Sequence, residues 1–347
     1  MCSKHCVMEK IEIRGLYGSS IVLVGETIEN VTKYLPTAKI FIVADENVKK
    51  LHGQVFPQFS TYSVKPGEGS KSLEEVSKIC EWLLENGANR NSFILGIGGG
   101  VTCDLAGFVA SVYMRGVDFG FVSTSLLSQV DASVGGKNGV NLQGYKNIVG
   151  TFTQPKLVIC DINLLSTLPQ EEYLNGFAEI VKHTLIADKH MFEFIEQNAE
   201  ELKLFNPVML EKLVAHSVRI KANIVQADER EQGERKKLNL GHTWGHAVEK
   251  VTGLSHGKSV SIGLEFAARL SAKRGLISNT DYLRIVNVLI ALDLPVCIKN
   301  NPEDIFNAMV KDKKQNESGI DFILIKRIGE VAIERIALNE LKTFINS

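Results

Sequence analysis

FILGIGGGVTCDLAGFVAS, residues 93–111, joins an apolar run to a helical pattern through three consecutive glycines. The apolar run predicts a short buried strand, and the residues after the glycines predict a helix. Gly98, Gly99 and Gly100 let a ligand approach the backbone, and the helix N-terminus offers free N–H groups and the positive end of its dipole. We therefore interpret the stretch as a binding site for pyrophosphate, although Val101 breaks the G-x-G-x-x-G dinucleotide pattern. A tight turn that binds nothing is the competing interpretation.

Similar apolar runs recur on both sides of this stretch and alternate with helical patterns. They cover residues 19–25, 39–45, 61–65, 119–123 and 156–161. One helix between them, SLEEVSKICEWLLENG, begins after Ser72 as its N-cap and closes at Gly87. Strands that alternate with helices predict a parallel sheet in an α/β domain.

The second half of the chain has a different pattern. From about Leu168 to Val310 the sequence is almost entirely helical, and a hairpin, IDFILIKRIGEVAIERI, follows at residues 320–336. We expect an α/β domain at residues 1–168 and a mostly helical domain at residues 169–347. A cleft between two such domains is a favoured place for a ligand.

Composition excludes several classes of function. The 347 residues carry a formal net charge of −1, which gives no reason to expect nucleic acid or an anionic membrane as a partner. We find no signal peptide and no apolar stretch that spans a bilayer. The six cysteines are dispersed, which fits a reducing cytoplasm.

CSKHC at residues 2–6 resembles a small metal motif, but a disordered terminus is the favoured interpretation because no second cysteine pair follows.

LNLGHTWGHAVEKVTGLSHGK, residues 238–258, contains three of the eight histidines. Residues 243–251 predict a helix, so His242 and His246 share one helix face and can point into the same space. Imidazole is a common zinc ligand, but Thr243 stands where a metalloprotease helix has glutamate. This stretch alone supports a metal site and a pair of structural histidines about equally.

Polar residues also gather in the glycine-rich loops of the first half. Asp45 follows a strand, where an acidic residue of a nucleotide-binding fold binds ribose hydroxyls. PGEGSKS, residues 66–72, precedes a helix, and we expect Glu68 and Lys71 to be exposed on it. The segment at residues 123–141 is denser in polar and flexible residues than a structural loop requires. Polar candidates in this and neighbouring segments are Arg115, Thr124, Asp131, Lys137, Asn141, Lys146 and Asn147.

Eight blocks of the chain, in order, resemble the 3-dehydroquinate synthase family of sugar-phosphate cyclases. They are GGGVTCDLAGFVAS, YMRG, LLSQVDASVGGKNGVN, KNIVGTF, LPQEEYLNGFAEIVKH, DEREQGERKKLNLGHTWGHAVE, SHGKSVSIG and KDKK. Because they keep their order over most of the chain, they are far more specific together than singly. The resemblance implies a dehydroquinate-synthase-like fold, with a Rossmann-like NAD-binding domain followed by a helical metal- and substrate-binding domain. It also implies a cytoplasmic homodimer of the shikimate pathway that acts on a small sugar phosphate.

The resemblance implies a divalent metal, zinc or cobalt, with Glu179, His242 and His256 as ligands. This changes the interpretation of the histidines, since His256 becomes the second imidazole ligand and His246 a catalytic neighbour. Three protein ligands leave open positions, as a catalytic metal requires.

The resemblance also implies contacts to NAD and to the substrate, 3-deoxy-D-arabino-heptulosonate 7-phosphate, a ligand with a phosphate and a carboxylate. The implied NAD-binding residues are Asp45, Asn47, Glu68, Lys71, Gly99, Gly100, Val101, Asp104, Thr124, Ser125, Asp131, Lys137, Lys146 and Asn147. The implied catalytic and substrate-binding residues are Arg115, Asp131, Lys137, Lys146, Lys182, Lys221, Arg235, Asn239, His246 and Lys313, and KDKK permits Lys314 in place of the last. Fixed cations suit such a dianion.

The chain departs from the family pattern at three places. Ser123 and Ser125 stand in STSLL where PTTLL is usual, and Tyr145 replaces the glycine of GKN. Lys258 stands in HGKSVSIG where glutamate is usual, two residues from an implied ligand. This charge reversal affects metal affinity or preference more than the type of reaction, because outer residues tune metal sites.

Three other functions compete with this interpretation. Another sugar-phosphate cyclase of the same fold would use the same cofactors on a different substrate. A polyol or glycerol-phosphate dehydrogenase would release NADH, but such enzymes lack the VGGKNGVN block. A non-catalytic NAD-binding protein is disfavoured because each implied ligand and cation is present in the sequence.

Overall fold

The structure, a computed structural model, describes residues 8–16, 18–312 and 319–345. CSKHC, Lys313 and Lys314 therefore lie outside the described residues. The chain forms two compact units. The sheet unit comprises Met1–Tyr173 and Pro207–Arg230, and the helical unit comprises Leu174–Asn206 and Glu231–Ser347.

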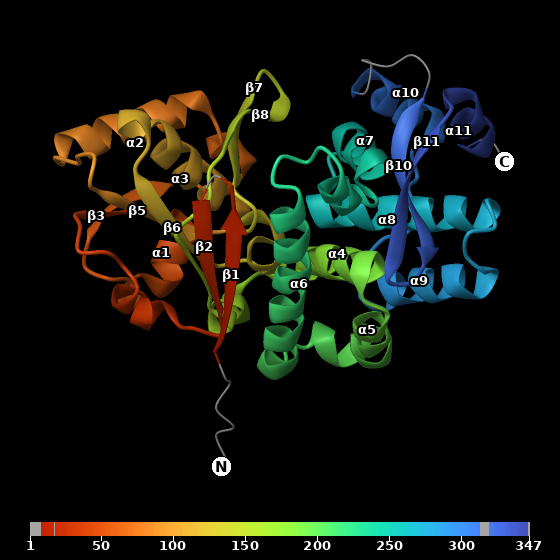
Figure 1. Cartoon of the computed structure of the whole chain (residues 1–347), viewed down its shortest axis with the longest axis horizontal. Coiled ribbons are helices and arrows are strands. Elements are labelled where there is room, and N and C mark those ends of the chain that lie inside the picture. The colour runs from red at the N-terminus through yellow and green to blue at the C-terminus, as the bar shows by residue number, and fades with distance from the viewer. Residues whose placement is uncertain (1–7, 17, 313–318, 346–347) are drawn as a thin grey trace, which may run out of the picture. The chain divides into compact units, whose positions relative to one another are not determined.

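The described residues of the sheet unit form a seven-stranded sheet (Figure 1). In spatial order its strands are β1 (Glu9–Gly15), β2 (Gly18–Val24), β9 (Leu157–Cys160), β6 (Asp118–Ser123), β5 (Phe93–Gly98), β3 (Ile40–Asp45) and β4 (Ser60–Val64). β1 pairs antiparallel with β2, and the other neighbours are parallel. The predicted α/β class and its six apolar strands are confirmed; β1 was not predicted.

Helices complete the crossovers between the parallel strands. They are α1 (Glu46–His52), α2 (Leu73–Glu85) and α3 (Gly100–Val112). Ser72 caps α2 as predicted, because its hydroxyl accepts a hydrogen bond from the backbone N–H of Glu75 at 3.2 Å. All six residues of β5 are buried, so both faces of this central strand are covered.

Besides β1, the sequence did not predict the hairpin of β7 (Lys137–Leu142) and β8 (Tyr145–Phe152) or the place of α6 (Pro207–Ala227) in the sheet unit. β7 and β8 form a separate antiparallel hairpin. α6, from the second half of the chain, packs with β1 and the short turn Ser128–Ala132. The two compact units thus interleave along the chain, and the domain division at residues 1–168 and 169–347 stays a prediction.

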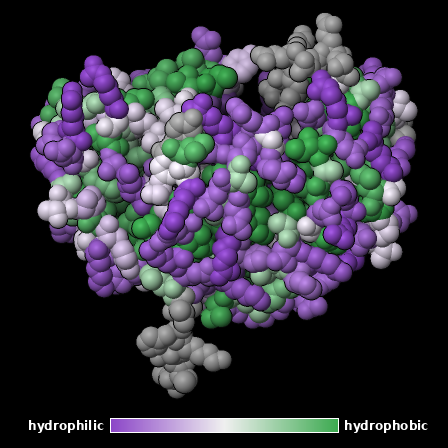
Figure 2. Space-filling model, viewed as in Figure 1, coloured by the Kyte–Doolittle hydropathy of each residue, from purple (hydrophilic) through white to green (hydrophobic). Residues whose placement is uncertain are grey.

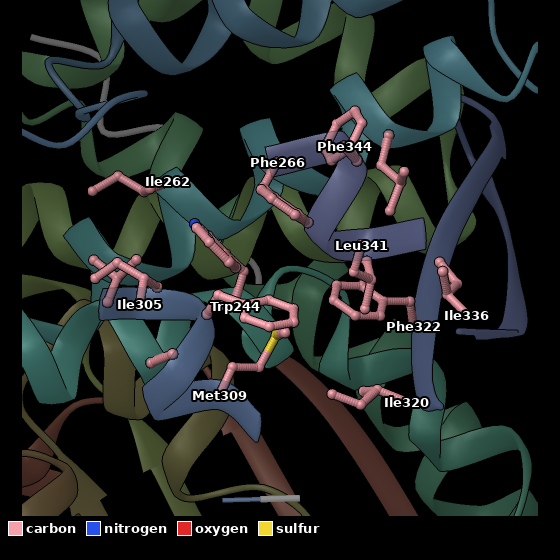
Figure 3. Packing of buried hydrophobic residues seen from close by; sticks show 14 of the residues in the cluster. Trp244, Ile262, Phe266, Ile305, Met309, Ile320, Phe322, Ile336, Leu341 and Phe344 are labelled. Carbon is pink, nitrogen blue, oxygen red and sulfur yellow. The ribbon is translucent and has the colours of Figure 1, made fainter. Parts of the chain in front are cut away.

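The helical unit has an apolar cluster made by side chains between Trp244 and Phe344. It contains α4 (Gln170–Ala187), α5 (Lys189–Lys203), α7 (His242–Thr252), α8 (His256–Lys273), α9 (Asn279–Ala291), α10 (Pro302–Asp312), α11 (Leu338–Ile345) and the hairpin β10 (Ile320–Arg327) and β11 (Glu330–Ile336). Figure 3 shows Trp244 of α7 against Phe266 of α8, with ring centroids 4.2 Å apart and planes 11° from parallel. Met309, Phe322 and Phe344 bring α10, β10 and α11 onto the same cluster.

Glycines bring the backbones of α7 and α8 into direct contact. A Cβ atom on Gly263 would lie 1.8 Å from the carbonyl oxygen of Gly241, and one on Gly245 would lie 2.8 Å from that of Ser259. Any side chain at these positions must therefore push the helices apart. The contact sets the spacing between His242 and His256, the first residues of the two helices.

Hydrophilic and hydrophobic residues are interspersed on the face drawn in Figure 2, and hydrophilic residues dominate it. Among the described residues, no helix combines the length and the apolar character needed to cross a bilayer.

Gly263→Ala tests the close packing of α7 on α8. We expect the free energy of unfolding to fall by about 3 kcal/mol, the upper end of the usual cost of overpacking, because the methyl group meets backbone. Urea unfolding at an unchanged m value measures the effect. Gly53→Ala is the control, since its Cβ would meet Lys49 at an ordinary 3.6 Å and Gly53 already has a helical φ of −59°. Equal stability of the two variants would contradict the packing argument.

Candidate active site

One carboxylate and two imidazoles converge in the helical unit. Glu179 of α4 is fully buried, and its Oε1 lies 3.2 Å from His256 Nε2 and 3.5 Å from His242 Nε2. Ligand atoms from the three residues lie within 4.8 Å of one another. The three residues that the resemblance implied as metal ligands are thus brought together.

The starts of α7 and α8 are held in place by local contacts. Gly241 precedes α7 with φ at +77°, a conformation that suits glycine. Ser255, the N-cap of α8, donates its hydroxyl to Asn175 Oδ1 at 2.7 Å. Asn175 and Glu179 are four residues apart and share one face of α4. α4 therefore presents Glu179 to the first residue of α8.

Charges around Glu179 fix which of its oxygens is available. The Lys182 ammonium forms an ion pair with Oε2, so Oε1 faces the two imidazoles. Burial would raise the pKa of Glu179, but Lys182, His242 and His256 together hold it well below its ordinary value. Glu179 is therefore a carboxylate, as a metal ligand must be.

The two imidazoles differ in protonation. Burial and the nearby Lys182 hold the pKa of His242 well below its ordinary value, so His242 is neutral and keeps a lone pair. Burial alone would lower the pKa of His256, but its contacts with Glu179 and Glu249 raise it to about 9. Without metal, protonated His256 thus supplies the positive charge that Glu179 requires.

Two nitrogens and one oxygen are a donor set that zinc and cobalt accept. His242 Nδ1 lies 3.1 Å from the carbonyl oxygen of Leu240, which leaves Nε2 on the side of Glu179. His246, the other histidine of the predicted face, is exposed beside the cluster, with its ring centroid 5.1 Å from that of His242. The residues present fit a divalent metal.

The predicted NAD residues follow the carboxyl ends of neighbouring parallel strands. Asp45 ends β3, Gly99 follows β5, and Thr124 and Ser125 follow β6. The backbone N–H of Thr124 donates to the carbonyl of Gly98 at 3.0 Å, which joins two of these ends. Ligands of open α/β sheets bind at this edge. The N-cap of α3 is Gly99, which has no side chain to occupy the helix N-terminus, so the arrangement fits a dinucleotide.

Lys71 is buried, contrary to the prediction that it is exposed. Only 5% of its side chain is accessible, and its ammonium lies 2.5 Å from Asp104 Oδ2 on α3. Burial raises the pKa of Asp104 despite this neighbour. The expectation failed because the neutralising partner lies 33 residues away in the sequence. Glu68 is exposed as predicted, and its Oε1 accepts a hydrogen bond from Asn141 at 2.8 Å.

Asp45 has a structural task. Its Oδ1 accepts hydrogen bonds from the backbone N–H groups of Asn47 at 2.8 Å and Val48 at 3.2 Å, which caps α1. Ser125 is similarly engaged, because its hydroxyl lies 3.1 Å from that of Ser128. Contact of either residue with NAD stays a prediction.

Several predicted substrate residues have partners within their own unit. In the sheet unit, Lys221 of α6 is buried and donates to Asp131, at 2.6 Å to Oδ1 and 2.7 Å to the backbone carbonyl. In the helical unit, Asn239 donates its amide to Glu231 Oε1 at 2.5 Å. Glu231 was missed by sequence reasoning; its φ of +61°, unusual for a glutamate, has no short-range signal in the sequence.

The remaining predicted cations divide by burial. Lys182 and Arg235 are buried in the helical unit. Arg115, Lys137 and Lys146 are exposed in the sheet unit, as is the uncharged Asn147, and Lys313 lies outside the described residues. Arg115 and its neighbour Met114 have φ angles of +71° and +48°, so YMRG is a strained turn. Lys258 is half-buried in the first turn of α8.

A cavity of about 430 Å³ lies elsewhere in the sheet unit. Phe93, Asp118 and Leu157, the first residues of β5, β6 and β9, line it, so it lies at the amino ends of the strands. The predicted NAD residues follow the opposite ends, and none of the predicted site residues lines this cavity.

Family models and curated relatives both match this chain to 3-dehydroquinate synthases. Family models for the 3-dehydroquinate synthase N-terminal and C-terminal regions match residues 61–175 and 176–315. The chain is 40% identical over 352 residues to 3-dehydroquinate synthase from Alkaliphilus metalliredigens, covering 97% of this chain and 98% of the relative. It is 41% identical over 333 residues to 3-dehydroquinate synthase from Dehalococcoides mccartyi, covering 93% of this chain and 92% of the relative.

Solved structures of related cyclases share the fold. A 2-deoxy-scyllo-inosose synthase complexed with carbaglucose-6-phosphate, NAD⁺ and Co²⁺ has a TM-score of 0.87 at 25% identity, covering 97% of this chain and 99% of its own. A 2-epi-5-epi-valiolone synthase from Streptomyces hygroscopicus with NAD⁺ and Zn²⁺ bound has a TM-score of 0.85 at 25% identity, covering 94% and 95%. The predicted dehydroquinate-synthase-like fold is confirmed.

Glu179→Gln tests the metal ligands. We expect affinity for zinc or cobalt to fall by at least about 10-fold, because the amide keeps the shape of the carboxylate but not its charge. Glu172→Gln, at an exposed position of the same helix, is the control. Metal analysis after dialysis against a competing chelator measures the loss. Full metal content in Glu179→Gln would refute the assignment.

Lys71→Met tests the buried pair with Asp104. We expect the free energy of unfolding to fall by about 3 kcal/mol, because a largely buried carboxylate loses its partner. The double variant Lys71→Met/Asp104→Leu should recover most of that loss, since neither charge then remains. Urea unfolding of the metal-free protein measures both. A double variant less stable than Lys71→Met would contradict the argument.

Proposed function

This chain belongs to the 3-dehydroquinate synthase family, and on that premise we propose that it converts 3-deoxy-D-arabino-heptulosonate 7-phosphate into 3-dehydroquinate and phosphate. Such an enzyme is an NAD- and metal-dependent carbon–oxygen lyase. Bound NAD would supply a transient hydride acceptor, and the reaction would be the second step of the shikimate pathway. The observation that carries the proposal is the convergence of Glu179, His242 and His256 in a chain that matches both family regions.

Glu179, His242 and His256 would hold the metal. A bound divalent ion supplies Lewis acidity toward substrate oxygens. Lys182 has a supporting task, because its ion pair with Oε2 keeps Oε1 directed at the imidazoles. Glu179 would therefore contribute Oε1 to the metal.

The sheet edge would hold NAD. The N-cap residue of α3 is Gly99, which has no side chain to cap the helix. The first backbone N–H groups of α3 would therefore bind the pyrophosphate. Lys71 holds Asp104 at the start of the same helix, and Asn141 holds Glu68. The proposed NAD residues are those given by the resemblance: Asp45, Asn47, Glu68, Lys71, Gly99, Gly100, Val101, Asp104, Thr124, Ser125, Asp131, Lys137, Lys146 and Asn147.

The proposed substrate residues bind and orient a dianion. Arg115, Lys137, Lys146, Lys182, Lys221 and Arg235 supply positive charge for phosphate and carboxylate. Asn239 donates its amide N–H to Glu231, so its carbonyl oxygen is left to accept a hydrogen bond from a substrate hydroxyl. His246 is exposed beside the proposed metal ligands, which supports a role in which it would exchange a proton with solvent or substrate.

A homodimer in the cytoplasm completes the proposal. Both properties follow from the family resemblance. Size-exclusion chromatography with light scattering measures the oligomeric state.

A related cyclase activity is the second candidate. The structures with high similarity include 2-deoxy-scyllo-inosose and 2-epi-5-epi-valiolone synthases, so the fold accepts different cyclase reactions. The 40% identity to 3-dehydroquinate synthases over nearly the whole chain favours the first candidate.

Phosphate release from 3-deoxy-D-arabino-heptulosonate 7-phosphate tests the function. The purified protein is assayed with and without NAD, and after chelation with zinc or cobalt restored. We expect release that needs both NAD and metal, without net NADH, because the hydride returns to the product. Net NADH would indicate a dehydrogenase, and release from another sugar phosphate alone would indicate the second candidate. Binding of NAD and metal with no turnover would indicate a non-catalytic protein.

A further inference from the structure

We propose that Glu249 is a positioning residue that orients His256 and strengthens it as a metal ligand. The inference rests on the proposed metal site. Glu249 Oε2 lies 3.5 Å from His256 Nδ1, while His256 Nε2 lies 3.2 Å from Glu179 Oε1. One imidazole thus stands between two carboxylates, one at each nitrogen. With Nδ1–H directed at Glu249, Nε2 carries the lone pair and faces the proposed metal position.

The backbone holds Glu249 in place for this task. It lies in the last turn of α7, where its carbonyl oxygen accepts a hydrogen bond from the N–H of Gly253 at 2.9 Å. Gly253 has φ at +71°, which ends α7 and lets the chain turn into α8. His256 is the first residue of α8, so this short turn brings its ring back to the last turn of α7. The side chain of Glu249 is 13% exposed and that of His256 is 30% exposed.

The other proposed imidazole ligand offers an internal comparison. His242 Nδ1 faces the carbonyl oxygen of Leu240 at 3.1 Å, and its Nε2 also faces Glu179. Both rings therefore present Nε2 to the same carboxylate oxygen. They differ in the Nδ1 partner, which is a neutral carbonyl for His242 and a carboxylate for His256. A carboxylate partner increases the electron-donating power of an imidazole, so His256 should be the stronger ligand.

The same residues permit a different role. Ligand atoms of His246, Glu249 and His256 also lie within 4.8 Å of one another, so this trio has the composition of a second metal position. We favour the positioning role because His256 Nδ1 cannot donate N–H to Glu249 and bind a second ion at once. Metal stoichiometry distinguishes the two roles.

Metal affinity tests the proposal without an activity assay. The metal-free protein is titrated with Zn²⁺ or Co²⁺ against a chromophoric chelator. We expect about 10-fold weaker binding in Glu249→Gln, which keeps an acceptor but loses the charge, and up to about 100-fold in Glu249→Ala. Glu265→Gln is the matched control, because Glu265 of α8 is 12% exposed and pairs with Arg269 and Tyr282. Its affinity should equal that of the wild type.

A double-mutant cycle separates positioning from a general structural effect. In a His256→Ala background, Glu249→Ala should weaken binding no further, because the residue through which it acts is gone. An equal additional loss in that background would overturn the proposal. So would wild-type affinity in Glu249→Gln and Glu249→Ala, or a second bound ion that Glu249→Ala removes. Thermal unfolding of the metal-free variants checks that each is folded.

The same titration distinguishes failure of this inference from failure of the proposed function. If Glu179→Gln and His256→Ala lose metal while the Glu249 variants do not, the metal site stands and the positioning role fails. If Glu179→Gln and His256→Ala bind metal as the wild type does, the proposed metal site fails, and the positioning role fails with it.

Discussion

The backbone contact between α7 and α8 is the constraint on which the candidate metal site depends. Gly263 lies against the carbonyl of Gly241, and Gly245 lies against that of Ser259, so the helices meet without intervening side chains. His242 and His256 begin these two helices, and their ring centroids are 5.4 Å apart. The stacked rings of Trp244 and Phe266 join the same two helices and belong to an apolar cluster with residues of β10 and α11. Core packing thus sets the distance between two polar side chains.

The fully buried Glu179 organises the charge of that site. An isolated carboxylate in such a place is very costly, and Lys182 at one oxygen and His256 at the other compensate it. The lysine is fixed by burial, whereas the charge on His256 is a proton that a metal can replace. Glu179 therefore has a cationic neighbour with or without metal, and the site can fold before the metal binds.

Sequence reasoning succeeded where the signal is local and failed where contacts are distant. Apolar runs and the glycine turn predicted β5 and α3, because strand and helix periodicities are readable in a short window. Lys71 was expected to be exposed because it lies in a glycine-rich polar loop, yet Asp104 neutralises it from another element. The i, i+4 pairing of His242 with His246 was equally local, and it overlooked that the turn after α7 brings His256 beside His242. Glu231 and Glu249 were missed because their tasks arise from tertiary contacts.

Several of the proposed substrate residues are held in place before a ligand binds. Lys221 is held by Asp131, Asn239 by Glu231 and Lys182 by Glu179, each at hydrogen-bonding or ion-pair distance within its own unit. Such side chains lose little rotamer freedom on binding, so more of their interaction energy is available to the complex. Lys137 and Lys146 lie exposed on β7 and β8, where water screens the charge of a side chain. The substrate must match or displace the partners that hold Lys221, Asn239 and Lys182, so these side chains favour a ligand of one shape. The exposed lysines of the hairpin suit attraction of an anion more than its discrimination.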